Sequence, residues 1–178
     1  MNLYLSPNGR ITQPTYWQGV LVLFVISAAL TVISAFMSPF LGFLSLLVIW
    51  PWIAVHVKRF HDAGKTGWLT VAIVVLAIII SLILGMILPA VFGVDVAGMQ
   101  AEMQRDMEDI AASNDPGAMV AAAMEQSKRI AQASLIPNVL ASAITTGVVG
   151  FVMSLFKSDP NENKYGPPTG PGSVDTFE

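Results

Sequence analysis

The stretch Leu69–Leu88 reads LTVAIVVLAIIISLILGMIL and contains no Asp, Glu, Lys or Arg. These 20 residues would form an α-helix of about 30 Å, which is the thickness of the hydrocarbon core of a bilayer. Buried helices of soluble proteins have shorter apolar runs. The stretch therefore predicts a membrane-spanning helix, which we expect at about 68–92.

A second interval without charged residues covers 11–57. As one helix it would measure about 70 Å, more than twice the thickness of the bilayer core. Ser38-Pro39 lies near its middle, and proline cannot continue a preceding helix but fits at the start of the next one. The interval therefore predicts two spans, at about 16–37 and 40–57, joined by a tight turn. The first span is too long and too directly followed by the second for a cleaved signal peptide.

A third interval without charge covers 130–156 and contains Pro137, so we expect a fourth span at about 136–156. Only 12% of the chain is charged and 54% is hydrophobic, whereas soluble domains carry about 25% charged residues. This composition excludes a disordered chain, a basic nucleic-acid-binding domain and a typical soluble enzyme. The predicted fold is an all-α integral membrane protein with four transmembrane helices, plus an extramembrane helical hairpin between the third and fourth.

Basic residues gather on one predicted side of the membrane. Residues 1–15, the loop 58–67 and the tail 157–178 together hold six of the nine Lys and Arg residues. The segment 95–135 holds three basic and seven acidic residues, a net charge of −4. Because Lys and Arg are retained on the cytoplasmic side, we expect both termini in the cytoplasm of a bacterial inner membrane and 95–135 outside. The tail beyond about 168 is rich in Gly and Pro and is expected to be disordered.

The external segment 95–135 is rich in helix-forming residues. The sequence Asn114-Asp115-Pro116-Gly117 interrupts it, and Asp115 can cap a second helix that begins at Pro116. Met99, Met103 and Met107 recur every four residues and so share one face of the first helix. This methionine face could bind a partner or the membrane interface, or it could pack against the neighbouring helix.

Most polar chemistry lies in VHVKRFHDAGKTGW, Val55–Trp68, which holds both histidines of the chain. Gly64-Lys65-Thr66 resembles the end of a phosphate-binding loop, but the required earlier glycine is Arg59 and no strand precedes it. His56 and His61 are five residues apart, which does not place two metal ligands on one helix face. A His61–Asp62 acid–base pair would need a nucleophile that the sequence does not place beside it. The sequence predicts no metal, no cofactor and no catalytic residue.

Two interpretations of this loop remain open. In the first, Lys58, Arg59 and Lys65 only orient the protein in the membrane, and Asp62 pairs with Arg59 or caps the turn. In the second, Arg59, His61 and Lys65 form a cationic pocket for a phosphate or a lipid headgroup, aided by glycine N–H groups.

Three short motifs occur along the chain. The central motif is Lys58-Arg59-Phe60-His61-Asp62-x-Gly64-Lys65-x-Gly67-Trp68, preceded by Pro51. The other two are Gly9-Arg10-Ile11 followed by Tyr16-Trp17, and Asn163-Lys164-Tyr165-Gly166-Pro167. Together they resemble a bacterial inner-membrane family, the "domain of unknown function 805", although Lys58 and Phe60 depart from the Arg-Arg-Leu-His-Asp of the family. The resemblance covers about 5–94 and 137–168, so 95–135 reads as an insertion.

The resemblance implies a small multi-spanning membrane protein and leaves its activity open. It also implies that the three motifs converge on the predicted cytoplasmic face. The predicted polar, anion-binding cluster consists of Arg10, Arg59, His61, Asp62, Lys65, Asn163 and Tyr165. Our first hypothesis is binding of an anionic lipid headgroup or a protein partner at this face. The alternative is a transporter or channel subunit that acts as a homo-oligomer, for which only His56 approaches an ionisable group within a span.

Overall fold

The computed structural model describes residues 2–111 and 115–169, and every regular element in these ranges is a helix. In chain order these elements are α1 (Asn2–Leu5), α2 (Gln13–Phe36), the 3₁₀ helix η1 (Pro39–Ser45), α3 (Leu46–Asp62), α4 (Leu69–Val91), α5 (Val96–Ala111), α6 (Pro116–Ala133) and α7 (Leu135–Ser154).

Four segments of the described chain are long and apolar enough to cross a membrane. They are α2, the continuous η1–α3 segment Pro39–Asp62, α4 and α7. The prediction of an all-α membrane protein with four spanning helices is confirmed.

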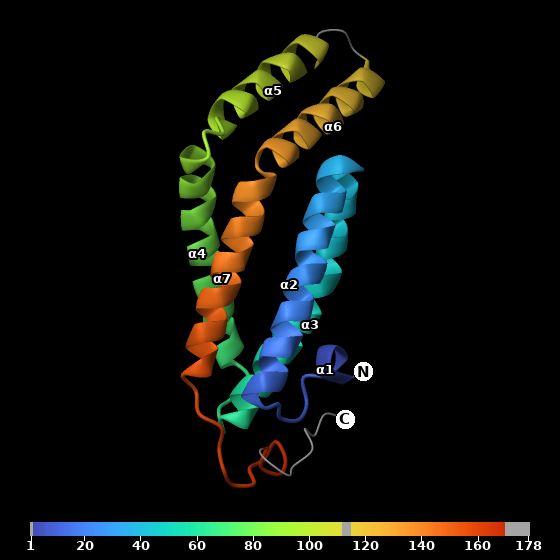
Figure 1. The fold of residues 1–178 in the computed structure, drawn as a ribbon. Coiled ribbons are helices and arrows are strands. Elements are labelled where there is room, and N and C mark those ends of the chain that lie inside the picture. Colours follow the sequence, from blue (N-terminus) through green and yellow to red (C-terminus); the bar gives the residue numbers. More distant parts are fainter. Residues whose placement is uncertain (1, 112–114, 170–178) are drawn as a thin grey trace.

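The four spanning helices form two pairs that meet at one end of the bundle. In Figure 1, α4 lies beside α7 and α2 beside α3, and the pairs diverge toward the end that carries α5 and α6. We call the converging end, where α1 and residues 155–169 lie, the base. Most of the buried core lies near the base, because most of its members come from the ends of the helices that meet there: Tyr16, Val20, Val55, Phe60, Ile73, Val149 and Met153.

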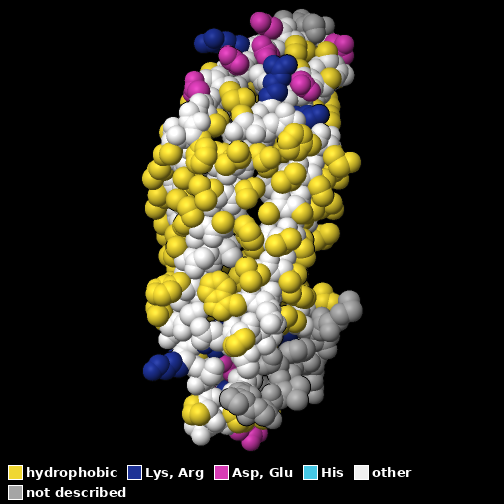
Figure 2. Space-filling view, in the orientation of Figure 1, with side chains coloured by type: hydrophobic (Ala, Val, Ile, Leu, Met, Phe, Trp, Pro, Cys, Tyr) yellow, Lys and Arg dark blue, Asp and Glu magenta, His cyan; other side chains and the backbone are white. Residues whose placement is uncertain are grey.

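The outer surface of the bundle is apolar. Figure 2 shows a broad band of hydrophobic side chains around the middle of one face, with Lys, Arg, Asp and Glu side chains toward the two ends. Only 6% of the most apolar window of α4 is buried inside the protein. A helix that is hydrophobic all round is stable only when something apolar covers it. Lipid therefore supplies the cover that the protein does not.

Only Met37 and Ser38 lie between α2 and the second spanning segment, so the turn at Ser38-Pro39 is short. Helix α2 ends at Phe36, and Pro39 then opens the 3₁₀ helix η1, which leads directly into α3. Proline can begin this element because the first residues of a helix need no N–H partner. The start of α2 is fixed by Thr12, whose side-chain oxygen accepts a hydrogen bond from the Thr15 N–H.

Helix α3 continues past Val57, where we expected the membrane span to end, as far as Asp62. Gly64 then ends it with a φ of +67°, a conformation that glycine adopts without steric cost. The Lys65 N–H donates to the Phe60 carbonyl at 2.8 Å and the Gly64 N–H to the His61 carbonyl at 3.0 Å. These two bonds form a Schellman motif. Arg59, His61 and Asp62 thus lie on a helix, and Lys65 lies beyond its end.

Helices α5 and α6 pack side by side as a hairpin (Figure 1). Asp115 caps α6 by accepting from the N–H groups of Gly117 and Ala118, as the sequence predicts. Met99, Met103 and Met107 are half-buried. The Gln132 side chain donates to the Ala35 carbonyl at 3.0 Å and so joins α6 to the end of α2. The predicted disorder of the tail falls mainly on 170–178, which lie outside the described residues.

Candidate functional site: a buried ion cluster beside a membrane groove

Asp62, the last residue of α3, is fully buried between two arginines. Its Oδ1 lies 3.4 Å from Arg10 Nε, and its Oδ2 lies 2.5 Å from Arg59 Nη1. Ser158 donates a hydrogen bond to Oδ2, and Thr169 donates one to Oδ1. Both carboxylate oxygens are therefore engaged twice, as a buried charge requires.

Arg10 is 0% exposed, and its guanidinium donates hydrogen bonds to backbone carbonyls. Nη1 donates to Asn161 at 2.9 Å and to Gly166 at 3.2 Å, while Nη2 donates to Asp159 at 2.5 Å and to Asp62 at 3.2 Å. Three carbonyls of the loop after α7 and the carbonyl of Asp62 at the end of α3 form a site for one guanidinium, whose planar donors point in fixed directions. Arg10 thus holds the segment 159–166 against the end of α3.

Arg59 plays a similar part for the end of α7. Its Nη2 donates to the Phe156 carbonyl, and its Nη1 donates to Ser158 Oγ at 3.2 Å. Phe156 lies just beyond the last turn of α7, where carbonyl groups lack helical partners and attract cations. The cluster of Arg10, Arg59 and Asp62, which we call the ion cluster, therefore joins the N-terminal segment, α3 and the residues after α7.

His61 and Tyr165 form a stacked pair beside the ion cluster. Their ring centroids are 3.6 Å apart and the rings are nearly parallel, at 5°. His61 Nδ1 donates to the Gly9 carbonyl at 3.2 Å, and the Asn163 side chain donates to the His61 carbonyl at 3.2 Å. Lys164 Nζ lies 4.9 Å from the centroid of the Tyr165 ring, within cation–π range.

The structure brings together six of the seven residues of the predicted cluster and leaves the seventh apart. Arg10, Arg59, His61, Asp62, Asn163 and Tyr165 share the contacts described above. Lys65 is exposed on the turn after Gly64. The polar atoms of Arg10 and Arg59 face the protein, so an added ligand would meet Lys65, His61 and Tyr165 before it met either arginine.

The sequence analysis did not identify several residues that bond to the ion cluster. Ser158 and Thr169 bond to Asp62, and carbonyls of Phe156, Asp159 and Asn161 bond to the arginines. Serine, threonine and backbone groups after a span carry no spacing signal of their own. The only available signal was the motif Asn163–Pro167, which implied that the segment following α7 returns to the bundle.

The two histidines serve different parts of the protein. His56 Nδ1 donates to the Trp52 carbonyl at 2.7 Å, and its Nε2 lies 3.2 Å from the Tyr16 hydroxyl, which can therefore only donate to it. His61 bonds to Gly9, and the Asp62 carboxylate bonds to arginines, so this neighbouring pair is not arranged as an acid–base dyad. Within the described residues, no group of His, Asp and Glu side chains is placed to hold a metal ion.

A groove of about 640 Å³ opens between α3 and α4 beside the His61–Tyr165 pair. Its walls are mostly apolar and come from both helices. Its mouth at the base is polar and aromatic, with Lys65 next to it in the chain. The wall residues are Trp50, Ile53, Val57, Thr70, Val71 and Val74, and the mouth residues are His61, Thr66, Gly67, Trp68 and Tyr165.

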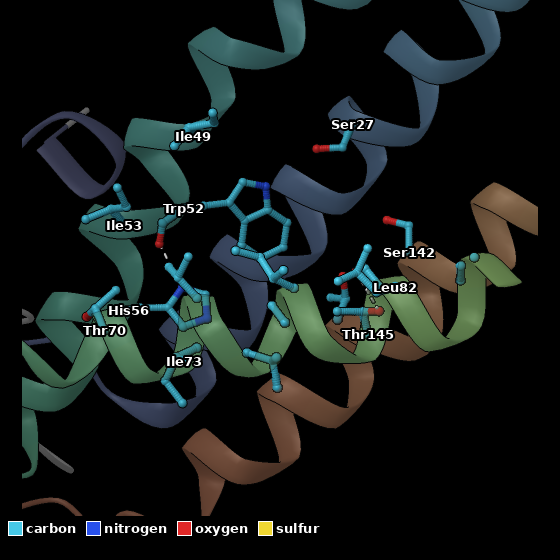
Figure 3. Close-up of a pocket in the computed structure, with 18 of the residues that line it drawn as sticks. Ser27, Ile49, Trp52, Ile53, His56, Thr70, Ile73, Leu82, Ser142 and Thr145 are labelled. Atoms are coloured by element: carbon cyan, nitrogen blue, oxygen red, sulfur yellow. Dashed lines mark hydrogen bonds between the residues drawn. The ribbon is translucent and has the colours of Figure 1, made fainter. Parts of the chain in front are cut away.

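A second cavity of about 660 Å³ lies deeper, between α2, α3, α4 and α7. In Figure 3 Trp52 and His56 extend from α3 toward this space, and Ser142 and Thr145 approach it from α7. The cavity adjoins the groove, because Ile53, Thr70 and Val74 line both.

Comparison with known proteins agrees with the motifs. The family model described as "Protein of unknown function (DUF805)" matches residues 4–167, which include all three motifs and the hairpin. No curated protein and no solved structure matches the chain. Since the family model covers nearly the whole chain, the protein belongs to the DUF805 family.

Proposed function

We propose that this chain is a multi-pass protein of a bacterial inner membrane that binds an anionic phospholipid through its base. In this proposal the base faces the cytoplasm and α5 and α6 lie outside. Six of the nine basic residues belong to the base and its flanking segments, and the hairpin segment has a net charge of −4. This asymmetry supports the orientation, because Lys and Arg near span ends are retained in the cytoplasm.

The observation that carries the proposal is the position of the groove between α3 and α4. Its apolar walls run along two spanning helices and suit an acyl chain, while its mouth presents His61, Thr66 and Tyr165. Two exposed lysines adjoin this mouth: Lys65 precedes Thr66, and Lys164 lies against the Tyr165 ring. Lysine ammonium groups near the headgroup region attract anionic lipid by about 1 kcal/mol each.

The ion cluster has a supporting role in this proposal. Asp62 already neutralises one of its two buried arginines, and the Nη groups of both arginines donate to carbonyls and Ser158 as well as to Asp62. Arg59 Nε is buried without a hydrogen-bond partner among the described residues. We therefore assign headgroup contact to His61, Lys65, Tyr165 and the adjacent Lys164. The ion cluster, with Asn163, holds the loop that carries Tyr165 in place.

The transporter alternative has less support. An ion or proton path through a span needs an ionisable group that can exchange protons or ligands. His56 is the one histidine well inside a span of the described chain, and both of its ring nitrogens have protein partners. Its hydrogen bonds suit a neutral, fixed tautomer rather than a relay.

The test is lipid binding by the full-length protein in a mild detergent, measured by native mass spectrometry. Phosphatidylglycerol and phosphatidylcholine with identical acyl chains are titrated in parallel. We expect a preference for phosphatidylglycerol, and we expect the K65A/K164A variant to lose about fivefold in affinity per lysine.

The matched control is K128A/R129A, which removes two basic residues from α6 at the other end of the bundle. It should keep the preference of the wild type. Equal binding of the two lipids by the wild type, or an unchanged preference in K65A/K164A, would contradict the proposal and favour a protein partner or a second copy at the base.

A further inference from the structure

Polar side chains contribute to the lining of the deeper cavity between α2, α3, α4 and α7, although most of its exposed surface is apolar. Eight of its lining residues carry polar side chains, and they come from all four spanning helices: Ser27, His56, Thr70, Ser81, Asn138, Ser142, Thr145 and Thr146. Within the described chain, none of its lining residues is Asp, Glu, Lys or Arg. Polar groups at membrane depth are costly and are retained where they face one another or a polar ligand.

Two of these polar groups lie near the middle of their helices. Ser81 Oγ and Thr145 Oγ1 are 3.3 Å apart and form a hydrogen bond across the cavity wall. Ser81 is close to the midpoint of α4 (Leu69–Val91), and Thr145 is close to the midpoint of α7 (Leu135–Ser154). The polar lining therefore extends to mid-depth rather than ending at the base.

Thr70 has an unsatisfied hydroxyl in the same cavity. Its side chain is only 4% exposed, and Oγ1 has no hydrogen-bond partner among the described residues. A buried hydroxyl left unpaired costs about 1–3 kcal/mol. A ligand that offers an oxygen at this point would remove that cost, whereas an acyl chain would not.

The cavity also has a lateral opening toward the lipid. Ile49 of α3 and Ile78 and Leu82 of α4 line it while remaining 51%, 53% and 63% exposed. A hydrocarbon tail could leave between these helices while a headgroup stayed inside. The volume of about 660 Å³ falls within the range of pockets that hold small molecules.

We propose that this cavity binds the uncharged, hydrogen-bonding headgroup of a membrane-soluble amphiphile, with Thr70 as one of its partners. The absence of charged side chains from the described lining disfavours an ionised headgroup, which would be buried without a counter-charge. Hydroxyl and amide groups suit a neutral headgroup with hydroxyl or carbonyl oxygens. Two kinds of neutral lipid have this chemistry: diacylglycerols, which carry a hydroxyl and ester carbonyls, and prenyl quinones, which carry ring carbonyls. The site is separate from the anionic headgroup site proposed at the base.

The test uses the full chain in detergent, with dioleoylglycerol and decylubiquinone as probes in separate arms of a native mass spectrometry titration. We expect at least one probe to bind the wild type, and the tighter of the two identifies the headgroup class. Thr70→Val, which keeps the shape of the side chain, should lower the affinity for that probe by about three- to tenfold. Ala77→Phe, which fills the cavity, should abolish binding.

The matched control is Thr31→Val, because the Thr31 hydroxyl bonds to the Ser27 carbonyl within its own helix and does not line the cavity. It should bind as the wild type does. Circular dichroism of each variant checks that the helices are retained. Binding of neither probe to the wild type, or unchanged binding by Thr70→Val, would overturn the proposal.

A third arm separates this site from the base. Phosphatidylglycerol binding should respond to K65A/K164A and persist in Ala77→Phe. If Ala77→Phe instead abolished phosphatidylglycerol binding, the cavity would accept a charged headgroup and the inferred neutrality of its ligand would be wrong. If K65A/K164A leaves phosphatidylglycerol binding unchanged while the results for the cavity variants are as expected, only the proposed function is contradicted.

Discussion

Arg10 and Asp62 lie 52 residues apart in the chain and meet as a fully buried ion pair, with 3.4 Å between Nε and Oδ1. Arg59 joins them from the preceding turn of α3, at 2.5 Å from Oδ2. One carboxylate thus serves two guanidinium groups at the place where the N-terminal segment, α3 and the residues after α7 meet. A shared counter-ion makes the cluster depend on Asp62 more than on any other member.

Replacing Asp62 with asparagine should therefore destabilise the protein strongly. Two buried guanidinium groups would lose the carboxylate that forms an ion pair with both of them, and breaking a buried ion pair typically costs about 3–5 kcal/mol. We expect a large fall in the thermal unfolding midpoint in detergent, followed by circular dichroism. Asp159→Asn at the same loop is the control and should have a small effect. Similar midpoints for the two variants would mean that the ion cluster contributes little to stability.

Two glycines of α7 should respond oppositely to the same substitution. A Cβ at Gly150 would lie 2.3 Å from Cη2 of Trp17, whose indole N–H donates to Ser154 at 3.1 Å. Gly150→Ala should therefore cost about 1–3 kcal/mol through overpacking. A Cβ at Gly147 meets no atom within 4 Å, so Gly147→Ala should be neutral or slightly stabilising. The thermal unfolding midpoints of the two variants measure this difference in stability. An equal fall in both midpoints would show that the close approach of α2 and α7 is not retained in detergent.

The four spans were readable from sequence because the absence of charge over some 20 residues has few other causes. Their relative packing was not readable. Ser81 and Thr145 look like ordinary polar interruptions of two spans, and only the packing of α4 against α7 places their hydroxyls in contact. The polar cavity therefore could not be predicted, since it requires residues from four helices in one register.

The sequence predicted most of the residues that come together in the candidate cluster, but it did not predict which of them are buried in ion pairs and which are exposed. Arg59, Asp62 and Lys65 lie in one short segment, and composition alone does not separate them. The end of α3 determines which of these residues are buried. Arg59 and Asp62 are three residues apart on the last turn of α3 and face the interior together. Gly64 then reverses the chain and leaves Lys65 exposed. The carbonyl partners of Arg10 carry no side-chain signal, so the burial of its charge was not foreseen.

Acid should loosen the loop after α7 through Asp159. The pKa of this carboxyl lies below its ordinary value because the Asn161 N–H and the Asn163 side chain donate to the ionised form. A depressed folded-state pKa gives stability above the unfolded value, about 3.9, and that stability is lost as the pH falls through the folded value. We expect faster proteolysis within 159–169 by pepsin at pH 3 than at pH 5, after correction for enzyme activity on an unfolded substrate. Asp159→Asn should remove this pH dependence. If the ratio of the proteolysis rates at pH 3 and pH 5 is unchanged in that variant, the pH dependence belongs to another group.

The proposed orientation predicts opposite behaviour of two fusion proteins. Alkaline phosphatase folds into an active enzyme only where disulfides form, outside the cytoplasm. A fusion after Met107 in α5 should therefore be active, and a fusion after Lys65 at the base should be inactive, because Arg10, Lys58, Arg59 and Lys65, which both fusions keep, retain that side in the cytoplasm. Green fluorescent protein at the same two positions gives the reciprocal control and checks expression. Activity after Lys65 with none after Met107 would invert the topology and, with it, place the groove mouth in the outer leaflet.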